Sequence, residues 1–302
     1  MYIVFPSTTD YYIPPVHRVY GFPDFYCKEE AMQALTTFGD VHHEQFINQG
    51  YLRLGQVLTS DQLTALQERI EDIMMGRVRY ENMRMQEVGE NSRTRRTIGN
   101  EQATLSYRRI DDLEQDPLFL AYIQHPLFSQ ITRRYIGEEV SVFRSMLMNK
   151  PPGRSQPLGW HQDVGAGWGI DQNPIITLWT ALDDASKATG SMQVVPGSNN
   201  YGIINQRHWL KPEDQDHYAP PEAVIDLEAE AGEAILLHNF LLHRSGTNST
   251  ASSRRAFSVT YMDAETRTLD TGQTFPVVFG EAALDPATVQ GKAADLVERF
   301  YG

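Results

Sequence analysis

The sequence predicts a mainly β protein, with a double-stranded β-helix core (jelly roll, cupin-like) and flanking helices. Two observations carry this prediction. The first half of the chain contains apolar residues at the three-to-four-residue spacing of amphipathic helices. From residue 138 onward, short β-type runs follow one another and are separated by turn-forming residues. Many short strands after a helical section indicate two packed sheets that are supported by helices on one face.

Helices are predicted mainly in the first half of the chain. A short helix at 44–48 and a strand at 51–54 precede a longer helix, which Ser60 opens as a capping residue. The apolar residues of this longer helix recur as on one buried face: Leu63, Leu66, Ile70 and Ile73. A pair of helices follows at 116–136 and is divided by Pro126, because proline lacks the N–H that a helix interior needs.

The second half of the chain contains the predicted strands. They are residues 140–148, 175–182, 192–196, 234–237 and 256–262. No internal repeat or linker-like composition divides the chain. We therefore expect one domain at 44–302, with helical support at 44–137 and the jelly-roll core at about 138–263.

Residues 1–43 are expected to form an N-terminal arm that is rich in aromatic residues and proline. Segments that stay disordered are poor in aromatic residues, so this arm is predicted to pack against other protein. It would pack near the mouth of the active site or at a contact between two copies of the chain. A homodimer is therefore one of the expected arrangements.

The composition of the chain indicates in which cellular compartment the protein is expected. The sequence has no run of 18 apolar residues, and its N-terminus lacks the basic and apolar segments of a signal peptide. Cys27 is the only cysteine, which excludes an intramolecular disulfide and fits a reducing compartment. A cytoplasmic protein without a membrane partner is predicted.

The net charge of −13 restricts the partners. Nucleic-acid binding needs a basic surface, so no nucleic-acid partner is expected. The one basic cluster, Arg93–Arg96, lies in a polar stretch and is predicted to be a solvated loop. The acidic balance favours a small-molecule substrate that is neutral or cationic.

Two histidines and one carboxylate have the spacing of a metal site. His161 and Asp163 are one residue apart, so on a strand their side chains point to the same face. Together with His243 they can form the facial triad of non-haem Fe(II) oxygenases, which leaves three coordination positions open. His238 competes for the third position, and the residues that follow His243 favour His243. The other histidines lack a matching carboxylate pattern and are predicted to be surface or structural: His17, His42, His43, His125, His208 and His217.

Several stretches together resemble the phytanoyl-CoA dioxygenase family of Fe(II)/2-oxoglutarate oxygenases. They are MLMNKPP at 146–152, WHQD at 160–163, LWTALDDA at 178–185, VVPGS at 194–198 and HRSGTNS at 243–249. The resemblance covers about residues 44–263 and departs from the family at Asn199, where a histidine commonly follows PGS. It implies that His161, Asp163 and His243 bind Fe(II), and that 2-oxoglutarate and O2 are co-substrates.

The resemblance also implies that Arg254, eleven residues after His243, binds the distal carboxylate of 2-oxoglutarate. In a strand, Arg254 shares its face with small or polar residues, whereas Arg255 shares its face with bulky ones. The small face suits a cavity that admits a dicarboxylate, and a guanidinium matches a carboxylate with two hydrogen bonds. Further positions that the resemblance places near the co-substrate are Ser245, Trp179 and Met146.

The loop at 164–174 is a candidate lid. It follows Asp163 directly and contains three glycines around Trp168. Active-site lids are commonly such loops, which close over the substrate and exclude water. Trp168 is therefore expected to line the substrate side of the iron.

The predicted activity is that of an Fe(II)- and 2-oxoglutarate-dependent dioxygenase. It would hydroxylate a small metabolite or biosynthetic intermediate and release succinate and CO2, although the same cofactors also support desaturation, epimerisation or ring formation. Asp163 argues against halogenation, because the related halogenases have a small residue there. One alternative is a non-redox metal-dependent isomerase or hydrolase, which would not need Arg254 and Ser245. The other is a non-catalytic metal-binding protein, against which the intact ligands count.

Overall fold

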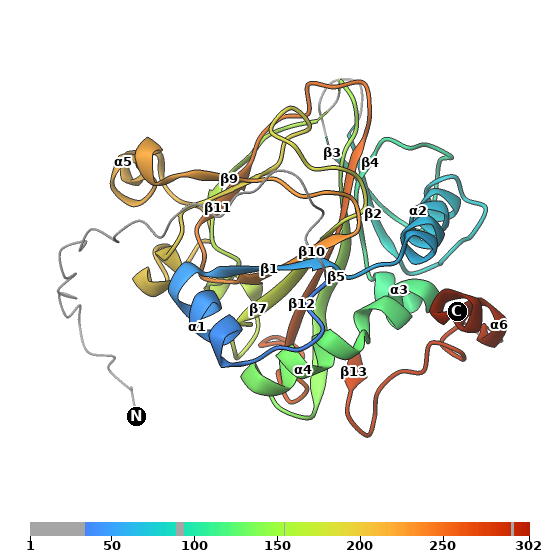
Figure 1. Ribbon diagram of the computed structural model, residues 1–302. Helices are drawn as coiled ribbons and strands as arrows, with labels where there is room; N and C mark the ends of the chain where they lie inside the picture. The colour runs from blue at the N-terminus through green and yellow to red at the C-terminus, as the bar shows by residue number, and fades with distance from the viewer. Residues whose placement is uncertain (1–33, 89–93, 154, 291–292) are drawn as a thin grey trace. The chain divides into compact units, whose positions relative to one another are not determined.

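Two antiparallel sheets form the β part of the protein, as the sequence predicts for a jelly roll (Figure 1). The computed structural model describes residues 34–88, 94–153, 155–290 and 293–302. The larger sheet contains β1 (Tyr51–Gln56), β2 (Arg84–Val88), β3 (Thr94–Ile98), β4 (Tyr107–Asp111), β5 (Val140–Lys150), β7 (Ile176–Ala181), β10 (Glu233–His238), β12 (Arg254–Asp263) and β13 (Val277–Phe279). The smaller sheet contains β6 (Leu158–His161), β8 (Met192–Val194), β9 (Ile225–Leu227) and β11 (His243–Ser245).

The strand order shows how distant segments meet. The larger sheet has the order β1-β10-β7-β12-β5-β4-β2-β3, with β13 also paired to β5. The smaller sheet has the order β6-β11-β8-β9. The long strand β12 therefore lies between β7 and β5, in the middle of the larger sheet, and each of the five predicted strands corresponds to a strand of the structure.

The predicted helices are present, with some shifted boundaries. They are α1 (Asp40–Gln49), α2 (Ser60–Met74), α3 (Pro117–Ile123) and α4 (Pro126–Tyr135); α5 (Gln215–Tyr218) and α6 (Ala294–Tyr301) are additional. The capping residue of α2 is Thr59, one residue before the predicted Ser60, because the Thr59 hydroxyl accepts a hydrogen bond from the Gln62 N–H at 3.2 Å. Pro126 is the first residue of α4, so the predicted division of the helix pair is confirmed.

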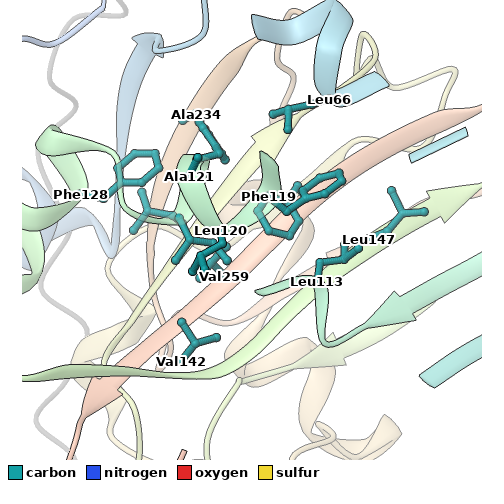
Figure 2. Packing of buried hydrophobic residues seen from close by; sticks show 14 of the residues in the cluster. Leu66, Leu113, Phe119, Leu120, Ala121, Phe128, Val142, Leu147, Ala234 and Val259 are labelled. Carbon is teal, nitrogen blue, oxygen red and sulfur yellow. The ribbon is translucent and has the colours of Figure 1, made fainter. Parts of the chain in front are cut away.

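Helix α3 packs against one face of the larger sheet (Figure 2). The ring of Phe119 lies 4.8 Å from that of Phe257 on β12, and Leu120 and Val259 belong to the same buried cluster. Burying a side chain of this size stabilises the fold by about 1.5–3 kcal/mol. The alternate residues of β12 face the other way, where Ala256 joins a second apolar cluster with Trp179.

The segment predicted as helical support also contains strands. β2, β3 and β4 extend the larger sheet beyond β5, and the predicted solvated loop at Arg93–Arg96 is wrong for the part that the structure describes, because Thr94–Ile98 is β3. Most of the β3 side chains are exposed, so the strand carries no apolar alternation that would reveal it in the sequence. Arg93 lies outside the described residues.

The predicted arm at 1–43 lies mostly outside the described residues, so its packing stays a prediction. Its last residues belong to α1, which begins at Asp40. In the part of the chain that is described, no helix is long and apolar enough to span a membrane.

Asp116, the capping residue of α3, supplies a test of how this helix is held. Its fully buried carboxylate accepts hydrogen bonds from the Leu118 and Phe119 N–H groups, from Arg69 Nε at 2.6 Å and from the Tyr80 hydroxyl at 2.6 Å. Removing one partner of a buried ion pair costs about 3–5 kcal/mol. We therefore expect Asp116→Ala to lower the free energy of unfolding in urea by about 3 kcal/mol or more.

The matched control for this prediction is Asp72→Ala. Asp72 is ion-paired with Arg77 at the surface, at 2.5 Å, with 37% of its side chain exposed. Exposed pairs contribute about 0–1 kcal/mol. Equal losses of stability in the two variants would contradict the role of Asp116.

Candidate metal centre

His161 and His243 lie side by side on adjacent strands of the smaller sheet. They are directly paired residues of β6 and β11, and their ring centroids are 4.0 Å apart. Asp163 follows two residues after His161, where its backbone N–H donates to the Asn239 carbonyl at 2.7 Å. Its carboxylate oxygens lie 3.8 Å from His161 Nε2 and 3.6 Å from His243 Nε2. The three predicted ligands therefore converge on one point.

The hydrogen bonds of the two histidine rings involve Nδ1 and leave both Nε2 atoms free to bind a metal. His161 Nδ1 lies 2.8 Å from the Gly159 carbonyl oxygen, and His243 Nδ1 lies 2.9 Å from the Leu241 carbonyl oxygen. A carbonyl only accepts, so each Nδ1 carries the proton and each Nε2 presents its lone pair. Backbone acceptors of this kind orient metal-binding histidines in proteins. The donor set fits a divalent metal that binds imidazole and carboxylate.

The charges at the centre also suit a cation. Burial lowers the pKa of His161 to about 3, so its ring is neutral at physiological pH. Burial raises the pKa of Asp163, but its electrostatic interactions with His243, His161, His208 and Arg144 outweigh burial and hold that pKa below its usual value. The carboxylate is therefore ionised and able to bind a metal.

A cavity of about 370 Å³ connects this centre with residues of both sheets. Arg254 lines it and is 4% exposed. Its Nη2 donates to the Gly190 carbonyl at 3.0 Å, whereas its buried Nε has no hydrogen-bond partner among the described residues. Burial lowers the pKa of Arg254 to about 10, so the guanidinium stays charged near neutral pH.

Ser245, Trp179 and Met146, the other predicted co-substrate residues, also line this cavity. The Trp179 ring centroid is 5.9 Å from the Arg254 guanidinium carbon. Gly190 has φ +83°, and an added Cβ would lie 2.7 Å from the Gly246 carbonyl oxygen, so this turn requires glycine.

Arg255 has a different environment from Arg254, as the alternation of strand faces predicts. Its guanidinium forms ion pairs with Asp183 and Glu71, both at 2.8 Å. Ser258, which shares the face of Arg254, lines the cavity, whereas Phe257, which shares the face of Arg255, lies in the core beneath α3. All three nitrogen atoms of the Arg255 guanidinium donate to the carboxylates of Asp183 and Glu71.

His238 lies away from the cavity. Its ring packs 5.6 Å from that of Phe46 and 5.4 Å from that of Phe240, and its Nδ1 accepts the Phe240 N–H at 3.2 Å. Nδ1 accepts only when it is deprotonated, and burial lowers the pKa of His238 to about 4, so the ring is neutral. Its position supports the choice of His243 as the third ligand.

His208 is a residue of the centre that the sequence did not reveal. The sequence predicts a surface or structural role for it, and the structure places one of its nitrogens within 4.8 Å of donor atoms of both His161 and Asp163. It thus competes with His243 geometrically. We assign the third ligand to His243, because its ring is fixed by a carbonyl acceptor and lies in register with His161. His208 Nδ1 has no partner among the described residues.

The backbone of His208 is in the left-handed region, at φ +77°, which is costly for a residue other than glycine. The sequence around it contains no carboxylate at metal-ligand spacing, so only the folded loop places it beside the centre.

Two tryptophans lie near the centre. Trp168 is not among the residues that line the cavity; it packs behind them, with its ring 5.4 Å from that of His208 and 3.8 Å from the Arg144 guanidinium carbon. Trp209, which the sequence reading missed, does line the cavity, is 46% exposed and lies 5.1 Å from the His161 ring.

The jelly roll and its centre place the protein in the class of cupin-fold enzymes that use Fe(II) and 2-oxoglutarate. Residues 46–256 match the family described as Phytanoyl-CoA dioxygenase (PhyH), which is more than half of the chain. The chain belongs to the phytanoyl-CoA dioxygenase family.

Curated relatives agree with this assignment. A probable phytanoyl-CoA dioxygenase of Caenorhabditis elegans is 27% identical over 230 residues, which cover 70% of this chain and 71% of that protein. The peroxisomal phytanoyl-CoA dioxygenase of Homo sapiens is 27% identical over 208 residues, which cover 64% of this chain and 57% of that protein. The chain thus spans little more than half the length of the human relative.

Solved structures share the fold. EctD from S. alaskensis, crystallised with 2-oxoglutarate and 5-hydroxyectoine, has a TM-score of 0.63 at 17% identity, covering 84% of this chain and 88% of that chain. The non-haem alpha-ketoglutarate-dependent carbocyclase SnoK from nogalamycin biosynthesis has a TM-score of 0.57 at 21% identity, covering 78% and 89%.

The ligand assignment predicts a specific pattern of metal loss. The anaerobic protein with Fe(II) and 2-oxoglutarate should show the visible charge-transfer band of a chelated keto acid. Alanine at His161, Asp163 or His243 should abolish the band and lower the bound iron, because each removes a ligand. His238→Ala and His208→Ala should keep both. If His208→Ala lost iron while His243→Ala retained it, the third ligand would be His208.

Proposed function

We propose that this chain is an Fe(II)- and 2-oxoglutarate-dependent dioxygenase that hydroxylates a small molecule. The observation that carries the proposal is the joint presence, in one cavity, of three converging metal donors and a buried arginine with an unpartnered Nε. A metal site alone would fit many chemistries. The buried, cavity-lining Arg254 adds a second site that matches the free carboxylate of a bound dicarboxylate.

Each group of the chain has a distinct task in this proposal. His161, Asp163 and His243 would hold the metal. Arg254 and Ser245 bind the distal carboxylate of 2-oxoglutarate, while Trp179 and Met146 form apolar walls that keep water out. When bound, the iron supplies the activation of O2 that is coupled to conversion of 2-oxoglutarate into succinate and CO2.

Hydroxylation is the outcome we propose among those that these cofactors support. A carbocyclase and an epimerase share the fold, but at 21% and 18% identity this likeness concerns the fold alone. Mass spectrometry separates the outcomes: hydroxylation adds one oxygen, desaturation and ring closure remove two hydrogens, and epimerisation leaves the mass unchanged. A non-redox isomerase or hydrolase would leave 2-oxoglutarate unconsumed.

Three further proposals rest on the sequence. They are a cytoplasmic location, a homodimer as one arrangement, and the division into an arm at 1–43 and a domain at 44–302. Gel filtration of the full chain tests the homodimer.

The co-substrate site predicts different effects for the two neighbouring arginines. Arg254→Ala should raise the apparent KM for 2-oxoglutarate by about 30- to 140-fold, because losing a charge-assisted contact of this kind costs about 2–3 kcal/mol. Steady-state succinate formation measures this constant.

Arg255→Ala is the matched control. It removes the same charge from the adjacent residue, whose partners are Asp183 and Glu71. It should lower the melting temperature but leave the KM for 2-oxoglutarate within about twofold. Equal KM changes in the two variants would rule out the assignment of Arg254.

A further inference from the structure

The cavity has the opposite charge to the chain. Among the described residues, its lining contains one carboxylate, Asp163, whereas the whole chain has a net charge of −13. The cationic side chains that line it are Arg96, Arg108, Arg109, Arg144, Lys150, Arg244 and Arg254. The prediction of a neutral or cationic substrate came from the net charge. The local charge favours the opposite sign, because a substrate meets the cavity lining and not the average of the surface.

Strand β5 separates these cations into two groups. Arg144, Met146, Met148 and Lys150 alternate along the strand, and all of them line the cavity. In the register with β12, Lys150 pairs with Arg254, whereas Arg144 pairs with Thr260. At about 3.3 Å per residue, Arg144 and Lys150 are about 20 Å apart along β5. Arg144 is therefore too far from Arg254 to share its carboxylate.

Arg144 differs from Arg109, Lys150 and Arg244 in what binds it. Arg109 is neutralised by three hydrogen bonds to Asp111. Lys150 Nζ donates to the Gln156 carbonyl, and Arg244 Nε donates to the Gln193 side chain. Within the described ranges, the Arg144 guanidinium forms no hydrogen bond or ion pair.

Aromatic rings hold Arg144 in place. Its guanidinium carbon lies 3.8 Å from the Trp168 ring centroid and 4.8 Å from that of Phe143. A guanidinium that stacks on a ring keeps the N–H groups in its plane free for a planar anion. Burial and the nearby Arg109 lower its pKa to about 10, so it is charged near neutral pH.

The charge of Arg144 would lack a counterion once Fe(II) and 2-oxoglutarate are bound at the centre. The metal-binding carboxylate of Asp163 is one of the two carboxylates that act on it, and the other, Asp111, is already bound to Arg109. Fe(II), Arg254 and Arg144 together carry four positive charges, whereas Asp163 and the dianion 2-oxoglutarate carry three negative ones. One positive charge among these groups is therefore unbalanced. Desolvated charges without a partner are costly, so an anion at Arg144 is favoured.

We propose that Arg144 binds an anionic group of the substrate, a carboxylate or a phosphate, and thereby selects small anions. This inference rests on the proposed function. Trp168 contacts both Arg144 and His208, and a His208 nitrogen lies within 4.8 Å of donor atoms of His161 and Asp163. The anionic group therefore lies close to the carbon that is oxidised. Trp209 presents an exposed ring at the same cavity, where it can pack against the carbon skeleton.

The first test is a titration of the full chain, held anaerobically with Fe(II) and 2-oxoglutarate. Acetate, inorganic phosphate and acetamide are added separately while tryptophan fluorescence is recorded, because an anion at Arg144 changes the environment of Trp168. Acetate or phosphate should bind at least tenfold more tightly than acetamide, the neutral analogue of acetate. The tighter of the two anions identifies carboxylate or phosphate as the group recognised. Equal binding of acetate and acetamide, with no effect of phosphate, would overturn the proposal.

Variants connect this preference with one side chain. Arg144→Gln should weaken anion binding at least tenfold, and Arg144→Lys should retain part of the affinity because it retains the charge. Arg133→Gln is the matched control, since Arg133 is exposed and ion-paired with Glu138 at the surface. It should leave anion binding unchanged. Anion binding that survives Arg144→Gln would assign the site to another cation.

The second test uses turnover. A metabolite extract is separated into anionic, neutral and cationic fractions, and each is incubated with the enzyme and 2-oxoglutarate. The product that gains one oxygen should arise in the anionic fraction, with its KM raised at least tenfold by Arg144→Gln. A product from the neutral or cationic fraction would refute the role of Arg144.

The two proposals fail in different ways. The Arg144→Gln variant should keep the charge-transfer band of the Fe(II) and 2-oxoglutarate complex, because Arg144 touches neither. Absence of that band in the unaltered protein would refute the proposed function. A normal band without anion preference would refute only the inference about Arg144.

Discussion

The register between β6 and β11 is the constraint on which the centre depends. His161 and His243 are paired residues of these short strands, and a slip of one residue would turn one of the rings to the opposite face. β11 has only three residues, so its own hydrogen bonds cannot fix it. Pairing with β8 on its other edge, where His243 lies opposite Val194, supplies the second support.

The loop after β11 is fixed to the end of β5, beside the residues predicted to bind the co-substrate. The Asn248 side chain donates to the Lys150 carbonyl at 2.8 Å and to the Ser252 carbonyl at 2.7 Å. These bonds tie the loop between β11 and β12 to the end of β5, so Ser245 and Arg254 keep a fixed relation to the metal ligands.

The two faces of the larger sheet at β12 have different environments: one faces the core beneath α3 and the other faces the cavity. On β12, Phe257 and Val259 are buried beneath α3, while the alternate residues Arg254 and Ser258 face the cavity. The charge of Arg254 is costly to bury, and its one hydrogen bond, to the Gly190 carbonyl, offsets only part of this cost. Tight packing on the helix side keeps the strand rigid while its other face carries an incompletely satisfied charge. Such a site gains stability when a carboxylate binds.

Local regularities made much of this architecture predictable. The opposite faces of Arg254 and Arg255 follow from strand geometry alone. Asp163 lies two residues beyond the end of β6, so the alternation of a strand does not by itself place its carboxylate beside His161. The same rule could not identify His208, because a left-handed backbone in a loop, and not a repeating pattern, brings its ring to the metal ligands. β3 was missed for a related reason, since a strand whose side chains are mostly exposed has no buried face to mark it.

Arg144 shows the limit of sequence reasoning most clearly. It lies in a correctly predicted strand, yet its lack of a counterion depends on which distant residues fold around it. Net charge is a poor guide here, because Asp163 is the one acidic residue that lines the cavity in the described part of the chain. A basic cavity in an acidic protein concentrates its field where low-dielectric walls exclude water. A dianionic co-substrate and an anionic substrate would both be attracted to this cavity. Because Arg254 and Arg144 are far apart along the paired strands β12 and β5, each anion would have its own cation.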